Sequence, residues 1–461
     1  MKRTIISNLL YALASQSIGL ILGVLRASIV PIYLGVTEFG VWQIYVLYLS
    51  FIGFFSYGYT DGIYLRFGSY SESDIDFHRL RTSLLFYVIS LLSTSVLIVL
   101  FILFQEYDSS KEIALLGVVP NIFLVCLVSY FSVIFQVTNQ IKKFSYFILI
   151  DKVVFFILLI LLMFVSKISF INLIIIDIAS KTILLLSLVF THKNYILGRV
   201  GNVKTGIFDY IKNIKYGSSL LLSNLVGILM LTIGRLYVEQ NFSLKEFAMY
   251  SLGIMLTNVA LMAISAISLV AYPAIKRVKS SQLGGVYTSI STTYSIFVPF
   301  IFLLYFIMVK VISEFMAEYS ELLSYLNLLF VICILQGKMQ LLINTYYKVL
   351  RLEFEMLKAN LITILSCVVF IFLSSVFLDS VIGVVYAILL AILLRVLMSD
   401  IYLMKTLSLK THKSFYDIIL CLVFLVLTSN FPNDASLFVV LVFSFLSLLL
   451  KWKEMLILVK A

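Results

Sequence analysis

The sequence predicts an all-α, polytopic membrane protein, and three observations support this prediction. Apolar residues make up 62% of the 461 residues and charged residues only 12%, whereas charged residues form about a quarter of a typical soluble protein. Apolar runs long enough to cross a bilayer, at about 20 residues each, follow one another along the whole chain. These runs are apolar on every face and do not alternate like the strands of a membrane barrel, so we expect helices.

The apolar runs predict about fourteen membrane-spanning helices. In chain order the predicted spans are 7–34, 41–60, 83–104, 113–136, 146–166, 170–190, 217–238, 248–272, 292–313, 321–345, 359–378, 382–403, 417–430 and 435–450. A short turn joins the fifth span to the sixth, so these two must form an antiparallel hairpin. The last two spans are shorter than a full crossing requires.

The first and seventh spans look like the openings of two related halves. Each contains one arginine, Arg26 or Arg235, and a Glu-Phe pair follows at Glu38 or Glu246 near the start of the next span. We therefore predict two pseudo-repeated six-helix lobes and two additional C-terminal helices. The expected division is an N-terminal lobe at 1–190, a cytoplasmic linker at 191–216, a C-terminal lobe at 217–403, and helices 13 and 14 with a cytoplasmic tail at 404–461.

The lysines and arginines between the spans lie mostly on one side of the membrane, which predicts that both termini are cytoplasmic. They are spread over separate inner segments, so the net charge of +11 does not require a nucleic-acid partner. The four cysteines are far apart within apolar runs, which indicates packing rather than a metal site or disulfides. The sequence contains no phosphate loop, zinc motif or nucleophile elbow, so we expect no cofactor.

Six basic side chains fall inside the predicted spans and are the candidates for a substrate-binding cavity. They are Arg26, Lys152, Lys181, Arg235, Lys338 and Arg395. A charge near the bilayer centre costs a few kcal/mol or more, so it normally faces a cavity, a partner or the nearest interface. Structural alternatives exist for most of them. Lys181 could neutralise Asp177 four residues away, Lys152 and Arg395 could reach the interface, and Arg235 could pair with Glu239.

Arg26 is the least easily explained by structure alone. It lies roughly 12 Å from the outer end of its span and has no acid within one helical turn, so we expect it to face a water-filled cavity. A cationic cavity suits an anionic ligand such as a phosphate or diphosphate group. Asp177 and Asp61 are the candidates for coupling to a proton or sodium gradient. Most tyrosines, Tyr45 among them, are expected to face lipid or the interface.

Several short motifs occur in a characteristic order. They are a glycine turn with an acid-aromatic-glycine run at 34–42, a glycine-rich exit at 58–66, a proline exit at 271–277, Pro299, and Asn-Thr-Tyr-Tyr at 344–347. In these motifs the chain resembles the polysaccharide biosynthesis (O-antigen type) flippases of the multidrug/oligosaccharidyl-lipid/polysaccharide exporter superfamily, or MOP superfamily. Two features depart from the pattern. Members often have twelve helices, and Ala248 stands where the first half has Gly40.

The resemblance implies a transporter, not an enzyme, in the bacterial inner (plasma) membrane. Such a protein would flip a polyprenyl diphosphate-linked oligosaccharide, an O-antigen (lipopolysaccharide) or capsule repeat unit, from the inner to the outer leaflet by alternating access. A polysaccharide polymerase and chain-length proteins are the implied partners. Two alternatives stay open. A cation-coupled multidrug antiporter of the same superfamily would favour an acidic cavity, whereas Asp177 is the one deep acid. A membrane polysaccharide polymerase would be expected to have a sizeable outer loop.

Overall fold

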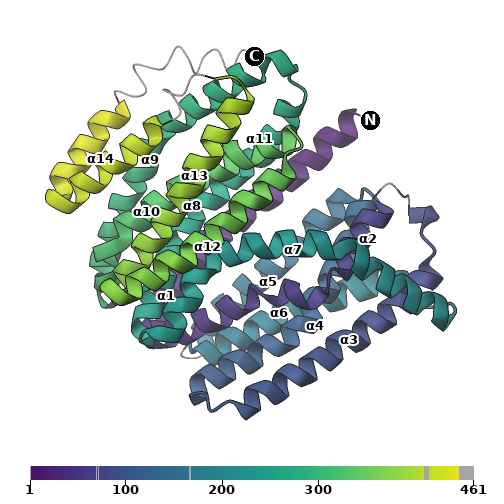
Figure 1. The fold of residues 1–461 in the computed structure, drawn as a ribbon. Helices are drawn as coiled ribbons and strands as arrows, with labels where there is room; N and C mark the ends of the chain where they lie inside the picture. Colours follow the sequence, from purple (N-terminus) through teal and green to yellow (C-terminus); the bar gives the residue numbers. More distant parts are fainter. Residues whose placement is uncertain (1, 69, 71, 166–167, 410–414, 446–461) are drawn as a thin grey trace. The chain divides into compact units, whose positions relative to one another are not determined.

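The computed structural model describes residues 2–68, 70, 72–165, 168–409 and 415–445. The regular elements in this part of the chain are all helices (Figure 1), which confirms the predicted all-α membrane fold. Nine of these helices are long and apolar enough to cross a membrane, or ten with a bent pair in α7 counted as one span. The chain forms two compact units, and the boundary between them lies at Thr232 and Ile233.

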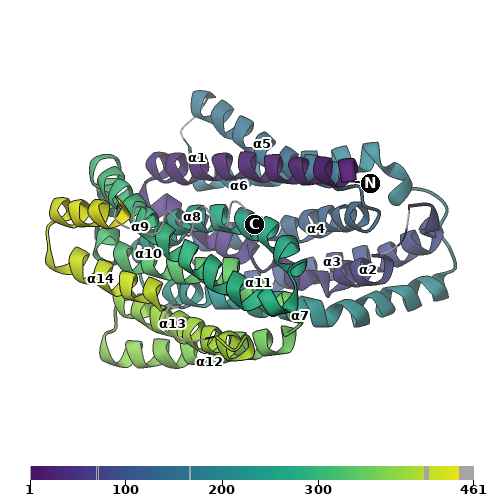
Figure 2. The same ribbon diagram turned by 90° about the horizontal axis from the view of Figure 1, so that it is seen from above.

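Unit 1, the part up to Thr232, contains six helices and the first part of a seventh. Their bounds are α1 Lys2–Leu49, α2 Tyr59–Phe67, α3 Phe77–Phe104, α4 Ser109–Val137, α5 Ile141–Val165, α6 Phe170–Thr191 and α7 Val203–Asn241. Helices α3, α4, α6 and α5 lie side by side (Figures 1 and 2). The last part of the predicted linker at 191–216 is therefore helical, since α7 begins at Val203.

Helix α1 contains the first predicted span and a little under half of the second. The expected turn at 35–40 is reduced to one residue, Gly35, whose φ of 71° and ψ of 170° interrupt the helix. Glycine adopts such a positive φ without the strain that a side chain would cause. Glu38, predicted to lie in that turn, instead accepts a hydrogen bond from the backbone nitrogen of Phe170 at 2.7 Å. It therefore satisfies a free backbone donor at the start of α6.

The second predicted span, 41–60, is not one continuous helix. A 3₁₀ turn at Ile52–Ser56 follows α1, and then Tyr57 and Gly58 have φ values of 53° and 78°, so α2 begins as a new helix. Two consecutive left-handed residues cannot continue a right-handed helix. Glycines also let α2 approach α7 closely, because a Cβ atom on Gly217 would lie 1.9 Å from the carbonyl oxygen of Gly58.

Unit 2 begins with the last part of α7. The following helices are α8 Leu244–Lys276, α9 Leu283–Phe315, α10 Leu323–Lys338, α11 Asn344–Val349, α12 Glu353–Phe377, α13 Val381–Thr406 and α14 Tyr416–Asn430. A π-helix at Met339–Ile343 joins α10 to α11, so these three form one span. Helices α12 and α13 lie side by side (Figures 1 and 2).

The end of the described chain contains two short apolar helices, α14 and Asn433–Phe445, and each is below the length of a full crossing. Helix α14 packs on α9, where the rings of Phe302 and Phe424 stack at 3.8 Å. Residues 446–450 of the last predicted span, and the predicted tail after them, lie outside the described residues.

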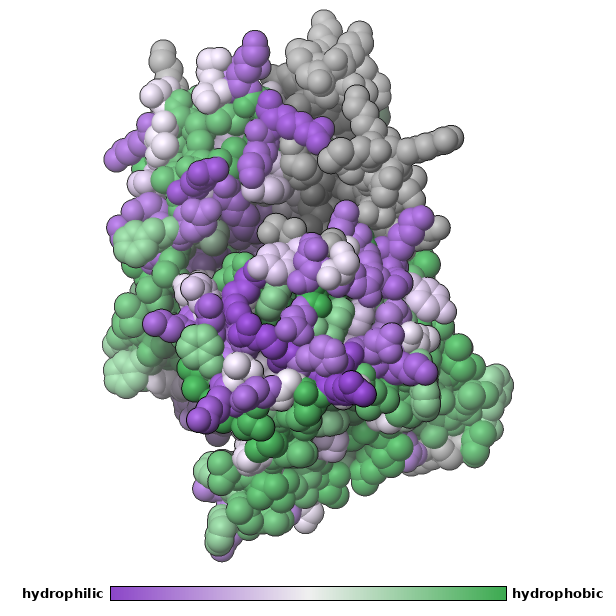
Figure 3. Space-filling model, turned by 90° about the vertical axis from the view of Figure 1, so that its right-hand side faces the viewer, coloured by the Kyte–Doolittle hydropathy of each residue, from purple (hydrophilic) through white to green (hydrophobic). Residues whose placement is uncertain are grey.

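Large apolar side chains cover much of the surface, as expected for helices that face lipid. Phe104, Phe164 and Phe190 are 84%, 85% and 77% exposed. Figure 3 shows wide apolar areas on one face, with the hydrophilic residues gathered in a separate region. In water such exposure would drive aggregation, whereas in a bilayer it matches the surrounding hydrocarbon.

Candidate functional site

A hydrogen-bonded polar cluster surrounds Asp177 within unit 1. Tyr45 on α1 donates to the carboxylate of Asp177 on α6 at 2.5 Å, and Asn121 on α4 donates to the Tyr45 hydroxyl at 2.9 Å. Lys181 also donates to Asp177, one helical turn away on α6. The local neutralisation of Lys181 considered from the sequence is therefore present. Tyr45 does not face lipid as expected, because its ring is fully buried in this cluster.

The neighbouring residues Asp151 and Lys152 on α5 contact two different helices, α6 and α1. Asp151 accepts a hydrogen bond from Ser180 on α6 at 3.0 Å. The ammonium of Lys152 packs so closely on Gly19 of α1 that a Cβ atom there would lie 2.5 Å from Nζ. Lys152 is partly exposed. The residues predicted on α1, α5 and α6 thus lie on helices that pack against each other.

Arg26 on α1 lies against two aromatic rings, which also stack on each other. Its guanidinium carbon is 5.0 Å from the ring centre of Trp42 and 4.3 Å from that of Phe155. The side chain is partly exposed and forms no ion pair within the described residues. Aromatic faces attract a cation without neutralising its charge. Arg26 therefore keeps its charge available for a ligand while its position is fixed by the rings.

Arg235 on α7 repeats part of this arrangement in unit 2. Its guanidinium carbon lies 5.9 Å from the ring centre of Phe247, and a nitrogen lies 3.4 Å from the hydroxyl of Ser251. Both partners are on α8, the next helix along the chain. The arginine that opens each half therefore contacts an aromatic residue near the start of the following span. Arg235 differs from Arg26 in being buried.

Lys338 on α10 is fully buried and is enclosed by acids. Its ammonium lies 2.8 Å from Asp400 on α13 and 3.1 Å from Asp417 on α14. Tyr287 on α9 also donates to Asp400. The sequence analysis identified Lys338 as a basic residue within a predicted span and did not identify Asp417 as its partner. An acid in the first turn of a helix is common, so its sequence position alone gave no signal of this contact.

Arg395 on α13 is also buried, at 4% exposure, and donates to the side-chain oxygen of Asn360 on α12 at 2.5 Å. Arg235, Lys338 and Arg395 thus have different sets of contacts within unit 2. Asp61 on α2 is partly exposed and makes no hydrogen bond or ion pair in the described residues. A substrate-binding role for the six cations and a coupling role for Asp61 and Asp177 stay predictions.

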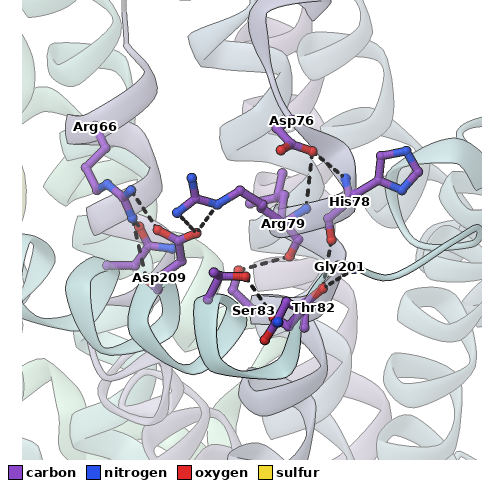
Figure 4. A network of polar contacts seen from close by, with 12 residues as sticks. Arg66, Asp76, His78, Arg79, Thr82, Ser83, Gly201 and Asp209 are labelled. Carbon is purple, nitrogen blue, oxygen red and sulfur yellow. Dashed lines mark hydrogen bonds and ion pairs between the residues drawn. The ribbon is translucent and has the colours of Figure 1, made fainter.

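A second polar network connects the start of α7 to α2 and α3, which also belong to unit 1 (Figure 4). Asp209 on α7 forms ion pairs with Arg66 on α2 at 3.1 Å and with Arg79 on α3 at 2.8 Å. The backbone nitrogen of Gly201 donates to the Thr82 hydroxyl at 2.7 Å, close to this ion pair. These contacts hold the segment before α7 and its first turns against α2 and α3.

Next to this network, α6 ends in an aromatic cluster around Tyr195. The hydroxyl of Tyr195 donates to Glu72 at 2.7 Å, its ring stacks on Phe77 at 5.1 Å, and His192 lies 5.5 Å away. Burial lowers the pKa of His192, the charge of Lys143 lowers it further, and Glu72 opposes both effects. The cluster therefore favours a neutral imidazole at this end of the unit.

No protein-family profile and no curated protein sequence matches the chain. Solved structures do match it. A structure described as "Lipid II flippase MurJ, inward closed conformation" has a TM-score of 0.64 at 16% identity, covering 98% of this chain and 100% of that one. The chain therefore has the fold of this solved structure.

The structures of two multidrug transporters also match. One is described as the MATE multidrug transporter DinF-BH, with a TM-score of 0.61, 14% identity, and coverage of 88% of this chain and 96% of that one. The other is an inward-facing multidrug resistance MATE transporter of the MOP superfamily, with a TM-score of 0.60, 13% identity, and coverage of 84% and 99%. At these identities the likeness establishes the shared fold alone, and the substrate has to be inferred from the side chains.

Proposed function

We propose that the chain is a transporter that flips a lipid diphosphate-linked oligosaccharide from the inner to the outer leaflet of the bacterial inner membrane, with both termini cytoplasmic. The observation that carries this proposal is Arg26, a partly exposed cation that two aromatic rings hold within a membrane helix. A phosphate group is the natural partner for such a guanidinium, since the planar fork of donors matches phosphate oxygens. The sugars would follow the diphosphate while the lipid tail stays in the bilayer.

The balance of intramembrane charges supports an anionic substrate. The deep acids Asp177, Asp400 and Asp417 are each in contact with a lysine. Among the arginines, Arg26 and Arg395 have no carboxylate contact in the described residues. A site for cationic drugs would instead need free carboxylates. Among these arginines, Arg26 is partly exposed and is therefore available to an anionic ligand, whereas Asp61 on α2 is a partly exposed acid.

The extent of the fold comparison also supports a flippase. The likeness to the lipid II flippase covers 98% of the chain, whereas the two multidrug transporters cover 88% and 84%. Alternating access fits the connection between the units, because the chain passes from one to the other at an interruption of α7 between Met230 and Thr232. Transporters that work by alternating access often contain discontinuous helices near the interface of their repeats.

Transport by purified protein in proteoliposomes tests the proposal. The substrate is a polyprenyl diphosphate-linked oligosaccharide in the lumenal leaflet, and its arrival outside is measured with a membrane-impermeant lectin. We expect Arg26→Ala to slow transport by about 10- to 100-fold, since a hydrogen bond to a charged group contributes about 1.5–3 kcal/mol. Arg26→Lys, which keeps the charge but loses the fork, should be intermediate. Equal rates for wild type and protein-free liposomes would contradict the proposal.

The multidrug antiporter is the second candidate, because Asp177 is a buried acid in a hydrogen-bonded cluster. In that case cells that overproduce the protein would tolerate cationic dyes better, and Asp177→Asn would abolish this tolerance. For a flippase we expect no change in dye tolerance. Arg26→Ala serves as the control, since removing a cation should not weaken the export of a cationic dye.

A further inference from the structure

Arg395 is a buried arginine that contacts no carboxylate within the described residues of unit 2. It lies roughly 16 Å from the C-terminal end of α13 at the helical rise, and its side chain is 4% exposed. One guanidinium nitrogen donates to the side-chain oxygen of Asn360 on α12 at 2.5 Å, whereas the buried Nε atom has no hydrogen-bond partner in this part of the chain. A buried charge is normally paired, because an unpaired one is very costly away from water.

The acids that lie near Arg395 in the sequence or on the neighbouring helix have other contacts. Asp400 is five residues further along α13, about 140° around the helix, and it contacts the buried Lys338 at 2.8 Å. Glu355 on α12 pairs at 2.9 Å with a lysine of its own helix. Outside the described residues the sequence contains one acidic side chain, Glu454. The chain therefore offers few possible counter-charges for this arginine.

Two hydroxyl groups lie beside the guanidinium. Ser399 is one helical turn further along α13, on the same face as Arg395. Its buried Oγ atom has no hydrogen-bond partner in the described residues, although the hydroxyl of Tyr347 on α11 lies near it. Tyr347 is also the titratable group that faces Arg395, and it is uncharged at neutral pH. Guanidinium and hydroxyl groups can all donate hydrogen bonds to an anion.

We propose that Arg395, Ser399 and Tyr347 form a binding site for one small monovalent anion, such as chloride. The ion balances the guanidinium charge and accepts hydrogen bonds from Nε and from the hydroxyl groups. The low exposure of Arg395 favours an ion over the bulkier head group of a lipid-linked oligosaccharide. The bound ion stabilises the packing of α12 on α13, the helices that the contact of Asn360 with Arg395 joins. This inference does not rest on the proposed transport function.

Thermal unfolding of the purified protein in detergent tests the proposal, with chloride replaced stepwise by the much larger gluconate ion at constant ionic strength. A ligand that binds only the folded state stabilises it in proportion to the logarithm of ligand concentration at saturation. We expect the melting temperature of the wild type to rise by about 2–4 °C for each tenfold increase in chloride. Arg395→Gln should lose this dependence, and the exposed Arg277→Gln in the same unit is the matched control that should keep it.

The same variant gives a second result that a purely structural role of Arg395 would not produce. In gluconate alone, Arg395→Gln should be at least as stable as the wild type, because it removes a buried charge that no ion then balances. In saturating chloride the wild type should be the more stable of the two. Crystals soaked in bromide, which replaces chloride and scatters X-rays anomalously, should show an anomalous peak beside the Arg395 guanidinium.

Three results would overturn the proposal. A wild-type melting temperature that does not depend on chloride would exclude the site, and a large loss of stability in Glu454→Gln would then assign the counter-charge to that acid. A chloride dependence of equal size in Arg395→Gln would place the ion elsewhere. The absence of a bromide peak at Arg395 would do the same. The wild-type titration and the bromide peak decide the matter even if Arg395→Gln does not fold.

Discussion

At the scale of single residues, the cations Arg26 and Lys338 have different surroundings. Arg26 in unit 1 is held by the rings of Trp42 and Phe155 and keeps its charge free. Lys338 in unit 2 is enclosed by two carboxyl groups and has no exposure. The first arrangement suits contact with a ligand, and the second ties helices together. Two cations inside helices can thus have different environments.

Lys338→Met should destabilise the protein by about 3–5 kcal/mol, since removing one partner of a buried ion pair leaves the other uncompensated. Thermal or chemical unfolding in detergent measures this loss. Lys310→Met is the matched control, because Lys310 lies 3.8 Å from Glu314 in an exposed pair that should contribute less than about 1 kcal/mol. Equal stability of the two variants would contradict the structural role of Lys338.

His192 should make stability depend on pH. Its pKa in the folded protein is lowered, so the unfolded chain binds the proton more readily. Stability is therefore complete above the ordinary histidine pKa of about 6.5 and declines as the pH falls through that value. The melting temperature of His192→Gln should lose this acid-dependent decline, which His78→Gln should keep. An unchanged pH profile in His192→Gln would exclude the effect.

At the scale of elements, glycines allow the backbones of α2 and α7 to approach each other closely. Gly58 and Gly217 bring the backbones of α2 and α7 together, and Gly62 does the same against the carbonyl oxygen of Asn213. These contacts, with the Asp209 ion pairs, attach the first part of α7 to unit 1. A helix between two units thus has one end firmly held by packing.

Gly217→Ala should therefore destabilise unit 1, because the added methyl group would meet the Gly58 carbonyl oxygen at 1.9 Å. Overpacking of this kind costs about 1–3 kcal/mol. Gly227→Ala on the same helix has nothing within 4 Å of the new methyl group, so we expect neutral or slightly increased stability from its helix propensity. The unfolding temperatures of both variants check this, and a stable Gly217→Ala would refute the close approach.

At the scale of the whole molecule, the topology predicted from basic residues can be tested with single cysteines. The native cysteines Cys126, Cys333, Cys367 and Cys421 are buried, so they should give little background. In intact spheroplasts a membrane-impermeant maleimide should label Ser109→Cys and not Lys204→Cys. Labelling of both positions after lysis is the control, and the reverse pattern would invert the proposed orientation.

Much of the fold could be predicted because long apolar runs permit few structures in lipid. The helical class followed from that constraint, and the contact of Lys181 with Asp177 followed from a spacing of four residues. The second span is interrupted at Tyr57 and Gly58, where the chain packs against α7. A local sequence pattern carries no information about such a tertiary contact. Asp417 lies 79 residues from Lys338 along the chain, and no sequence periodicity connects them.

The π-helix at Met339–Ile343 sets the rotation of α11 about the helix axis relative to α10. Relative to regular α-helical winding it accommodates about one surplus residue, which turns everything beyond it by roughly 100°. Tyr346 and Tyr347, which follow the π-helix, are buried in this arrangement. Deleting a single residue from this stretch would restore even winding, yet it would rotate both rings away from the core. Chain length at this place is therefore as strictly constrained as amino-acid identity.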